Sequence, residues 1–517
     1  MPETRTPERG SVPPAARPLD EHNRRLLENV HPPEWPNPTP ADRYHLVVVG
    51  AGTGGLVTAA IAASLGARVA LVERELMGGD CLNVGCVPSK AMIRAARAWA
   101  DARSAAERFG GPSAGGGESF ALVMERMRCI RAEMSAVDSA RRFRDELGVD
   151  VFIGEGRFTG PDTLRVGEVS LPFRAAVIAT GARPAAPSIP GLGEVDYLTN
   201  ETVFSLTEAP EHLVVIGCGP IGCEMAQAFA RLGSRVTVLE GGDRILQHDD
   251  PDAAAVVAAA MKRDGVDLRT GAEVESVEAP GDGVRVRYRR EGEEAGSVEG
   301  SHLLVAVGRA PNVEALDLDT AAVEFDPREG ITVDERLRSS NSRIYAVGDV
   351  ASKYRFTHMA DALARLVVRN ALFFGRGKAD DLVVPWCTYT SPELAHVGMT
   401  AQEADEAGDE VNTITVPLHD VDRARLDGEV EGFLRVHLDG GSDRILGATL
   451  VAEHAGDLIS QLTQAMVTGT GLGKVGETIF PYPTRAEVIR KAADAWRRTR
   501  LTPTAKSAFD LFFRVLR

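Results

Sequence analysis

A strand, a glycine loop, a helix and a second strand follow one another twice in this sequence, and this repetition constrains the fold more than any other feature. The first copy has a strand at 46–49, the loop Gly50-Ala-Gly52-Thr-Gly54-Gly55, a helix at 56–65 and a strand at 68–72. Glycines in such a loop let the backbone turn tightly and approach a pyrophosphate, whose charge then lies at the helix N-terminus. Glu73, 23 residues after Gly50, is placed to accept hydrogen bonds from a ribose. The unit therefore predicts a dinucleotide-binding domain.

The second copy begins at a strand, 213–216, and continues through Gly217-Cys-Gly219-Pro-Ile-Gly222 to a helix and a strand that ends before Glu240. Two complete copies imply two dinucleotides in one chain, and hence a relay between them. Glu240 would accept a ribose 2′-hydroxyl and repel a 2′-phosphate, which favours NADH, although the nearby Arg244 leaves NADPH open. Cys218 and Cys223, within this second unit, are expected to be small packing thiols.

A second pair of cysteines lies in the Gly-rich segment 78–90. Cys81 and Cys86 have four residues between them and precede a predicted helix at 91–100. A bridge there closes a very short loop and contributes little through chain entropy, so it is better interpreted as redox-active than as structural. A thiolate is the reactive form, and a helix N-terminus with a nearby positive charge favours it.

The composition excludes several classes of partner. Of the 517 residues 58 are basic and 74 acidic, giving a formal charge of -16, which argues against nucleic acid or an anionic membrane. Six cysteines are too few for a disulfide scaffold, and a reactive dithiol suits a reducing, cytoplasmic setting. The uncharged stretch 46–67 has the length of a membrane span, but its five glycines and strand-turn-helix pattern favour the nucleotide-binding unit. We expect no signal peptide in residues 1–40.

The segment 78–90 resembles the redox motif of the FAD-dependent pyridine nucleotide-disulfide oxidoreductases, and the resemblance extends from Tyr44 to Leu501. It implies an α/β fold with two Rossmann-like domains, for FAD and NAD(P)H, and a C-terminal α+β dimerisation domain that forms a homodimer. The expected boundaries are an N-terminal Pro-rich arm at 1–43, the FAD domain at 44–197 and 314–381, the NAD(P) domain at 198–313, the dimerisation domain at 382–500 and a tail at 501–517.

The resemblance also implies roles for individual residues. Cys86 is the thiolate nearer the flavin, and Cys81 is the thiol that meets the substrate. Lys90 is the cation beside the flavin and Glu224 its acidic partner, with a plain structural ion pair as the alternative. Asp349 is expected to hydrogen-bond the ribityl chain, although an ordinary helix N-cap is the alternative. The full set of expected cofactor-binding residues is Gly50, Gly52, Gly55, Glu73, Gly79, Lys90, Thr180, Gly181, Gly217, Gly219, Gly222, Glu240, Gly308, Gly348 and Asp349.

The segment 479–487 departs from most of the family. Disulfide reductases and dihydrolipoamide dehydrogenases have a His where this chain has Tyr482, while the acid five residues later is retained as Glu487. A tyrosine with a pKa of about 10 shuttles protons poorly at neutral pH compared with a histidine of pKa about 6.5. Mercuric reductases carry Tyr here, contributed by the partner chain, and their soft metal substrate prefers thiolate ligands.

Two other features differ from mercuric reductases. Those enzymes end in a pair of adjacent cysteines that hand over the metal, whereas the last cysteine here is Cys387, 130 residues from the end. They often carry an N-terminal metal-binding domain with a Cys-x-x-Cys motif, and residues 1–43 contain no cysteine. Any mercury delivery must therefore differ.

Three hypotheses for function remain. The leading one is NAD(P)H-dependent reduction of a thiophilic electrophile, with Hg(II) bound transiently by Cys81 and Cys86. The second is reduction of a low-molecular-weight disulfide, a reactive sulfur species or a quinone. The third, from another class, is a redox or metal sensor whose dithiol does not turn over.

Four further expectations concern the N-terminal arm, two segments within the chain and the C-terminal tail. The ends of the polar, Pro-rich arm are expected to be disordered, although Leu26, Leu27, Val30 and Trp35 could pack it on the folded body. A Gly-rich loop is expected at 110–117, followed by a charged helical run at 120–147. The aromatic and basic tail, 509–516, is expected to pack on its own dimer.

Overall fold

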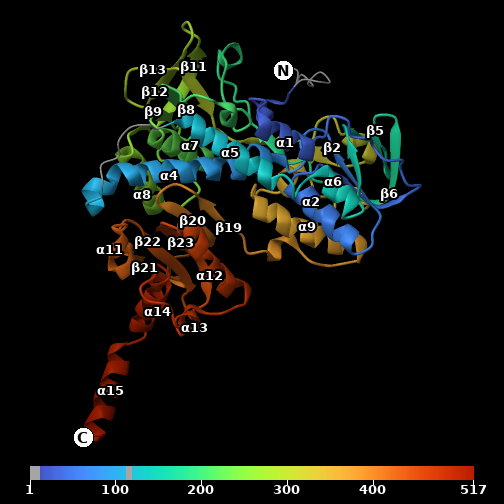
Figure 1. Ribbon diagram of the computed structural model, residues 1–517. Coiled ribbons are helices and arrows are strands. Elements are labelled where there is room, and N and C mark those ends of the chain that lie inside the picture. The colour runs from blue at the N-terminus through green and yellow to red at the C-terminus, as the bar shows by residue number, and fades with distance from the viewer. Residues whose placement is uncertain (1–11, 112–118, 517) are drawn as a thin grey trace.

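The computed structural model describes residues 12–111 and 119–516, which form three sheet-centred units and a separate C-terminal helix (Figure 1). The strands of the first unit lie in the order β3-β2-β1-β6-β5-β4, and β18 also pairs with β6. Their bounds are β1 (Tyr44–Val49), β2 (Val69–Glu73), β3 (Asp150–Ile153), β4 (Gly156–Gly160), β5 (Thr163–Val166), β6 (Val169–Ile178) and β18 (Ile344–Ala346). β1 is parallel to both neighbours, with Val48 opposite Leu71 and Val177. Helices α2 (Thr53–Ser64) and α9 (Thr357–Leu372) pack against each other in this unit.

The second unit contains a four-stranded parallel sheet in the order β10-β9-β8-β14. Its strands are β8 (His212–Ile216), β9 (Arg235–Leu239), β10 (Val266–Arg269) and β14 (His302–Val305), with helices α7 (Pro220–Arg231) and α8 (Pro251–Arg263). An antiparallel sheet of β11 (Ala272–Glu278), β12 (Val284–Arg290) and β13 (Gly296–Gly300) adjoins it. The short strands β7 (Ala182–Pro184) and β15 (Arg309–Pro311) pair where the chain passes between the first two units. β16 (Phe325–Asp326) and β17 (Gly330–Ile331) form a two-stranded sheet, and Phe325 and Ile331 pack against the core of the first unit.

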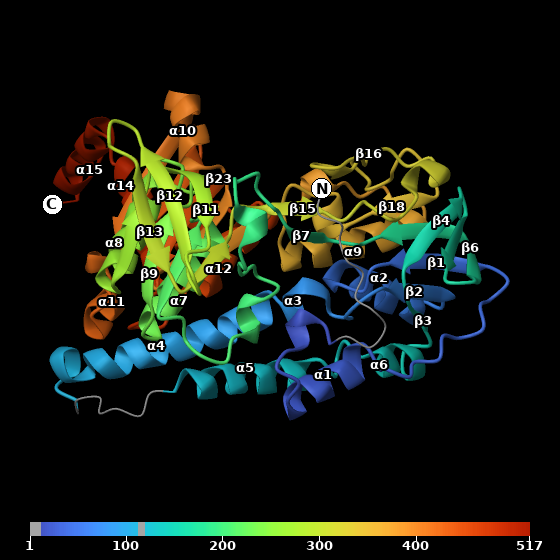
Figure 2. The ribbon, with the colours of Figure 1, turned by 90° about the horizontal axis from the view of Figure 1, so that it is seen from above.

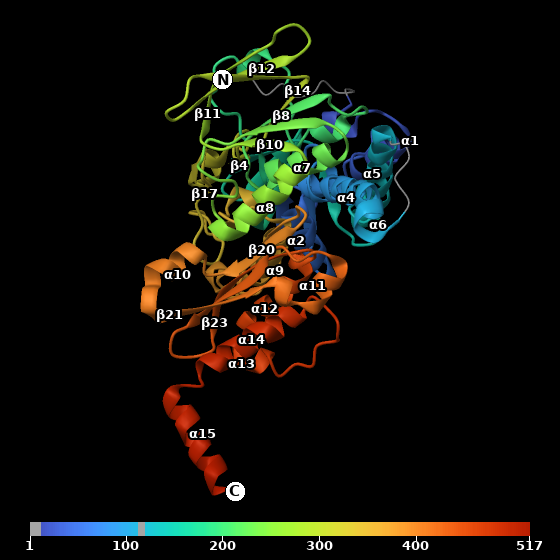
Figure 3. The ribbon, with the colours of Figure 1, turned by 90° about the vertical axis from the view of Figure 1, so that its left-hand side faces the viewer.

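The third unit is an antiparallel five-stranded sheet in the order β19-β20-β23-β22-β21. Its strands are β19 (Pro385–Thr388), β20 (Glu393–Gly398), β21 (Val411–Pro417), β22 (Phe433–Asp439) and β23 (Ile445–Ala452). Its helices are α10 (Ala401–Ala407), α11 (Asp422–Asp427), α12 (Ala455–Val467), α13 (Leu472–Val475) and α14 (Glu487–Thr499). The last helix, α15 (Pro503–Val515), extends away from the body and has no buried residue (Figures 1 and 3).

Helices α4 and α5 lie side by side across the first two units (Figure 2). α4 spans Cys86–Phe109, so the predicted helix at 91–100 extends in both directions; Pro88 is tolerated because it lies in the first turn. The predicted run at 120–147 is two helices, α5 (Phe120–Met134) and α6 (Ala140–Asp145), because Ser139 caps a new helix start. The predicted loop at 110–117 lies outside the described residues from 112 onward.

The N-terminal arm packs as expected. Its helix α1 (Glu21–Val30) begins at the N-cap Asp20 and buries Leu26 and Val30 completely. Leu27 and Trp35 pack against the same hydrophobic core, which also contains β1, β2 and α9 side chains. The arm is therefore part of the first unit's core rather than an appendage.

Among the described residues, no helix combines the length and apolarity that crossing a membrane requires.

Candidate active site

A cavity of about 1150 Å³ runs between the first and second units and connects both glycine loops with the cysteines of 78–90. Sixteen of the residues expected from the sequence to act or to bind cofactors line it: Gly50, Gly52, Glu73, Gly79, Cys81, Cys86, Lys90, Thr180, Gly181, Gly217, Gly219, Glu224, Glu240, Gly308, Gly348 and Asp349. Gly55 and Gly222 lie behind the loops, where a Cβ atom would come within 1.8 Å and 2.1 Å of the carbonyl oxygens of Gly50 and Gly217. A side chain at either position would force its loop open.

The first glycine loop is held in a shape that suits a dinucleotide phosphate. Gly50 has φ +100°, and a Cβ there would lie 2.4 Å from the Ala179 carbonyl oxygen, so only glycine fits. Glu73 accepts hydrogen bonds from the backbone N–H groups of Ala51 (2.7 Å) and Glu75 (2.8 Å). The loop opens onto the N-terminus of α2, where free N–H groups favour an anion. These features fit the ADP part of FAD.

The second loop repeats this arrangement. Glu240 accepts hydrogen bonds from the N–H groups of Cys218 (2.7 Å) and Gly242 (2.8 Å) and from Nε2 of Gln247 (3.0 Å). Arg244 donates to the Gln247 carbonyl oxygen at 2.7 Å, so its guanidinium is engaged by its own loop. The carboxylate of Glu240 faces the cavity beside the N-terminus of α7, which fits a second dinucleotide.

Residues 78–90, called the redox segment below, pack directly against the first glycine loop. A Cβ on Gly79 would lie 2.6 Å from the Cα of Gly52, so the two segments touch backbone to backbone. Cys81 lies in the short helix α3 (Gly79–Asn83), and Cys86 is the first residue of α4. The turn between the two helices therefore carries both sulfurs on the wall of the cavity.

The two thiols differ in acidity. The hydrogen bond between them raises the pKa of Cys81 and lowers the pKa of Cys86 to about 6, although burial acts in the opposite direction on Cys86. The Thr357 hydroxyl, 3.4 Å from the Cys86 sulfur, and the charge of Lys90 also lower the pKa of Cys86. Cys86 is therefore the thiolate at neutral pH, and Cys81 is the thiol that donates a proton toward it.

Lys90 and Glu224 form an ion pair of 2.8 Å that joins α4 to α7. The Glu224 side chain is buried and also accepts a hydrogen bond from the Tyr389 N–H at 2.9 Å. Burial alone lowers the pKa of Lys90, but the charge and the hydrogen bond of Glu224 outweigh it and raise that pKa. Lys90 therefore stays charged beside Cys86.

Asp349 lies in a single helical turn at 348–350 and lines the cavity, where burial raises its pKa. Arg309 pairs with it at 3.4 Å and also pairs with Asp80, the neighbour of Cys81. Arg309 thus connects the start of the redox segment to the return of the chain into the first unit.

Tyr482 and Glu487 lie away from this cavity within the chain. Tyr482 is 72% exposed and donates a hydrogen bond to Asp422 at 3.1 Å. Glu487 is buried and accepts a hydrogen bond from Arg490 at 2.7 Å. Both line a separate hollow of about 370 Å³ in the third unit. One chain alone does not bring them to the cysteines.

The sequence did not single out three residues that belong to the site, namely Thr357, Tyr389 and Arg309. Thr357 is 271 residues from Cys86, and Tyr389 is 165 residues from Glu224. Neither lies in a local motif, so only the tertiary fold reveals them. Arg309 follows Gly308 directly, but its pairing with Asp80 is likewise a tertiary contact.

Comparison with known proteins agrees with this geometry. Residues 44–364 match the family described as pyridine nucleotide-disulphide oxidoreductase, and residues 384–493 match its dimerisation domain. Mercuric reductase of Bacillus cereus is 37% identical over 450 residues, covering 87% of this chain and 71% of that protein. Dihydrolipoyl dehydrogenase of Bacillus subtilis is 33% identical over 472 residues, covering 88% of this chain and 98% of that protein. The solved Cu(II) complex of the HOCl-induced flavoprotein disulfide reductase RclA from Escherichia coli has a TM-score of 0.77 at 28% identity, covering 86% of this chain and 98% of that one.

Proposed function

This chain belongs to the pyridine nucleotide-disulphide oxidoreductase family, whose members use FAD and NAD(P)H, and on that premise we propose that it reduces a thiophilic acceptor, with Hg(II) as the leading candidate. The observation that carries the proposal is the pair Cys81 and Cys86, which lies with unequal pKa values on a cavity that reaches both glycine loops. The overall reaction balances as NAD(P)H plus Hg(II) giving NAD(P)⁺, Hg(0) and one proton.

FAD, when bound, supplies a two-electron carrier between the nicotinamide and the dithiol. The chain's own residues prepare that transfer. The loops at Gly50 and Gly217 hold the two pyrophosphates, and Lys90 places a positive charge beside the Cys86 thiolate. Cys81 and Cys86 then bind the metal as two thiolates, releasing their remaining proton, because a soft cation prefers thiolate ligands.

NADH is the proposed electron donor rather than NADPH. Glu240 keeps a carboxylate at the end of β9, where a 2′-phosphate would be repelled. The guanidinium of Arg244 donates to the Gln247 carbonyl oxygen of its own loop. A Glu240→Ala variant should lose selectivity for NADH over NADPH, measured as the ratio of kcat/KM values.

Tyr482 of the partner subunit is proposed to complete each site in the homodimer. Its exposure and its position outside its own chain's cavity suit a residue that acts across an interface. The dimerisation domain that carries it matches the family over 384–493. Tyr482→His should raise disulfide reductase activity without improving Hg(II) turnover, and no gain with any disulfide would count against this role.

Reduction of a small disulfide, a reactive sulfur species or a quinone is the second candidate. One observation favours it: the proteins similar to this chain include a dihydrolipoyl dehydrogenase and a flavoprotein disulfide reductase. A sensing role without turnover is the third candidate, and it differs from both enzymes in consuming only one equivalent of NADH.

The test is anaerobic consumption of NADH by the flavin-loaded protein, with Hg(II) in excess small thiol in one series and a panel of disulfides and quinones in another. Sustained consumption with Hg(II) supports the leading proposal. Sustained consumption with another acceptor alone replaces mercury by that acceptor. Consumption that stops after one equivalent with every acceptor overturns both enzymatic proposals and favours a sensor. Cys86→Ser is the matched control, because it retains both nucleotide loops.

A further inference from the structure

Two buried arginines on α5 face the N-terminal arm, one helical turn apart, and they have different partners. Arg128 is 7% exposed and forms an ion pair with Asp20 at 2.6 Å. Arg131 is completely buried and donates instead to two uncharged groups, the Asn83 carbonyl oxygen at 2.6 Å and Oδ1 of Asn23 at 2.7 Å. Figure 2 shows α1 running alongside α5, where these contacts occur.

Burying Arg131 in this way is costly for folding. Burial lowers its pKa to about 10, so the guanidinium still carries its charge at neutral pH. A buried charge without a directly bonded counter-ion is weak support for stability, because desolvation outweighs what two neutral acceptors return. Stability alone therefore does not account for the buried contact between Arg131 and the carbonyl group that it holds, that of Asn83.

That group lies inside the redox segment. Asn83 is the last residue of α3, between Cys81 and Cys86, and is 3% exposed. Its side-chain amide donates to the carbonyl oxygens of Met77 (3.0 Å) and Gly79 (2.9 Å), which ties the end of α3 back to its beginning. Arg131 thus donates to the main chain of the same residue, Asn83, whose side chain joins the two ends of α3.

The arm supports the same segment from behind. Asn23, fully buried on α1, presents Oδ1 to Arg131 and donates from Nδ2 to the Pro18 carbonyl oxygen at 2.7 Å. The Val30 carbonyl oxygen, at the end of α1, accepts a hydrogen bond from the Met77 N–H at 3.1 Å. The arm therefore contacts both the start of the redox segment and, through Arg131, its middle.

We propose that Arg131 is a positioning residue for the dithiol: backed by Asn23 of the arm, it holds the Asn83 carbonyl so that the two sulfurs stay within bonding reach. This inference rests on the proposed redox role of Cys81 and Cys86. It also gives the N-terminal arm a function, which is to hold the guanidinium of Arg131 in place.

The step affected is the exchange between the disulfide and the dithiol. With dithiothreitol as reductant, the Cys81–Cys86 bond breaks and each sulfur gains one electron, while dithiothreitol forms its cyclic disulfide and gives up two protons. At neutral pH Cys81 takes one of these protons, Cys86 remains a thiolate, and the second proton goes to solvent. A segment that is no longer held lowers the effective concentration of one thiol at the other, so the protein disulfide becomes less stable relative to the dithiol.

The test compares Arg131→Met with Arg128→Met in the full chain, equilibrated with reduced and oxidised dithiothreitol and quantified by alkylation and mass spectrometry. Arg131→Met should shift the equilibrium about tenfold toward the dithiol, which corresponds to about 30 mV for a two-electron couple. Arg128→Met should stay within about twofold of wild type, because its partner is Asp20 and not the redox segment. Asn23→Ala, which leaves Arg131 in place, should shift the equilibrium in the same direction by a smaller factor. Asn23→Asp keeps an acceptor for Arg131 but loses the donor to the Pro18 carbonyl, so it should shift the equilibrium less than Asn23→Ala does.

Wild-type equilibria for both Arg131→Met and Asn23→Ala would overturn the inference, as would an equal shift in Arg128→Met, because that result would indicate a general loosening of the arm. If Arg131→Met does not fold, the two Asn23 variants decide the question. A wild-type protein that forms no Cys81–Cys86 disulfide would overturn the proposed function as well, whereas a normal wild-type disulfide with unaffected variants overturns only the role of Arg131.

Discussion

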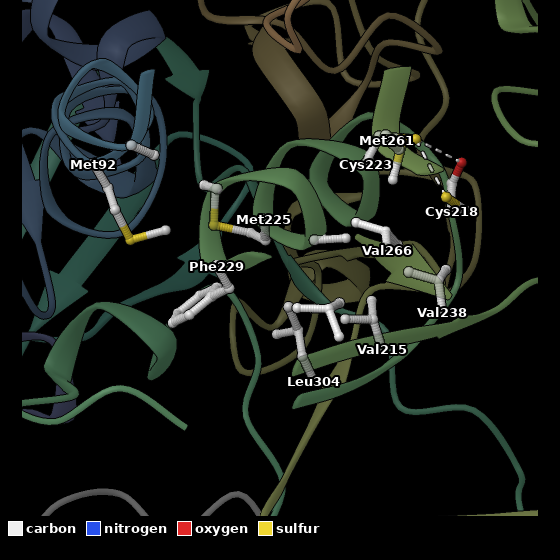
Figure 4. Packing of buried hydrophobic residues seen from close by; sticks show 14 of the residues in the cluster. Met92, Val215, Cys218, Cys223, Met225, Phe229, Val238, Met261, Val266 and Leu304 are labelled. Atoms are coloured by element: carbon white, nitrogen blue, oxygen red, sulfur yellow. Dashed lines mark hydrogen bonds between the residues drawn. The ribbon is translucent and has the colours of Figure 1, made fainter. Parts of the chain in front are cut away.

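Two pairs of cysteines, Cys81/Cys86 and Cys218/Cys223, have the same spacing, with four residues between the two cysteines of each pair. Each pair lies beside a dinucleotide loop. Cys81 and Cys86 line the cavity, with Lys90 and Thr357 favouring the thiolate of Cys86. Cys218 and Cys223 are both completely buried, with their sulfurs 3.3 Å apart inside the core of the second unit (Figure 4). Burial and the nearby carboxylates of Glu224 and Asp249 raise the pKa of Cys223.

Spacing alone does not make a dithiol reactive. Both pairs have sulfurs close enough to interact, and Cys218 also borders the cavity. The side chains of Cys218 and Cys223 are nevertheless completely buried, whereas Cys86 is exposed and has the charge of Lys90 beside it. Thiols need a stabilised thiolate and an approach path to exchange electrons, and a buried thiol in apolar surroundings is inert. The environment therefore favours the proposed redox role for Cys81 and Cys86, and the burial of Cys218 and Cys223 agrees with their expected role as packing thiols.

The largest expected effect comes from removing the thiolate. Cys86→Ser should lower NADH-driven turnover by at least about a thousandfold, because the thiolate that takes electrons from the flavin into the dithiol is lost. Steady-state kinetics with the preferred acceptor measure this. Reduction of bound flavin by NADH should persist, so a variant that loses that half-reaction as well would indicate misfolding rather than a missing thiolate.

The next effect in size is expected from removing Lys90, the cation beside Cys86. Lys90→Met should raise the pKa of Cys86 from about 6 to about 7 and reduce turnover at pH 6.5 by about threefold, since an opposite charge nearby favours the ionised form. The pH dependence of iodoacetamide alkylation at Cys86 gives the pKa. Lys474→Met, which removes an exposed lysine paired with Glu477, should leave both quantities unchanged.

Titration should separate the two pairs without any substitution. In the reduced protein the Cys86 thiolate should be lost as pH falls through about 6, because protonation occurs at the lowered pKa. The long-wavelength absorbance of a thiolate beside flavin follows this change. Cys223 should remain a neutral thiol across the same range because its pKa is raised. A midpoint near the ordinary thiol pKa of about 8.5 would contradict the environment described for Cys86.

The smallest effect is expected at the buried pair. Cys223→Ala should leave turnover within about twofold of wild type and reduce the free energy of unfolding by about 1 kcal/mol, as is usual for removing a small buried group. Denaturant unfolding and steady-state rates together measure this. A large loss of activity with unchanged stability would give Cys218 and Cys223 a chemical role after all.

The sequence predicted the parts of the fold that depend on local pattern. Both strand-loop-helix units, with Glu73 and Glu240 at the ends of β2 and β9, lie within a few residues of their predicted positions because glycine loops and apolar strands are strong local signals. The start of α4 was misplaced by five residues, since the sequence around Cys86 gives no cap signal that marks it.

The contacts that complete the site could not be predicted in the same way. Thr357 and Tyr389 reach the redox segment from more than a hundred residues away. The arm was expected to pack, but its link to Asn83 through Arg131 depends on the placement of three separate helices. The contribution of Tyr482 from the partner subunit remains a prediction, because it depends on how two chains meet.

The most direct measurement is the state of each cysteine after anaerobic reduction by one equivalent of NADH, read by alkylation and mass spectrometry. The proposed relay predicts that Cys81 and Cys86 change from a protected disulfide to two alkylated thiols, while Cys218 and Cys223 are unchanged between the oxidised and reduced samples. If NADH changes the labelling of Cys218 and Cys223, or leaves Cys81 and Cys86 as a disulfide, then electrons do not pass through the pair on the cavity wall and the proposed mechanism is wrong.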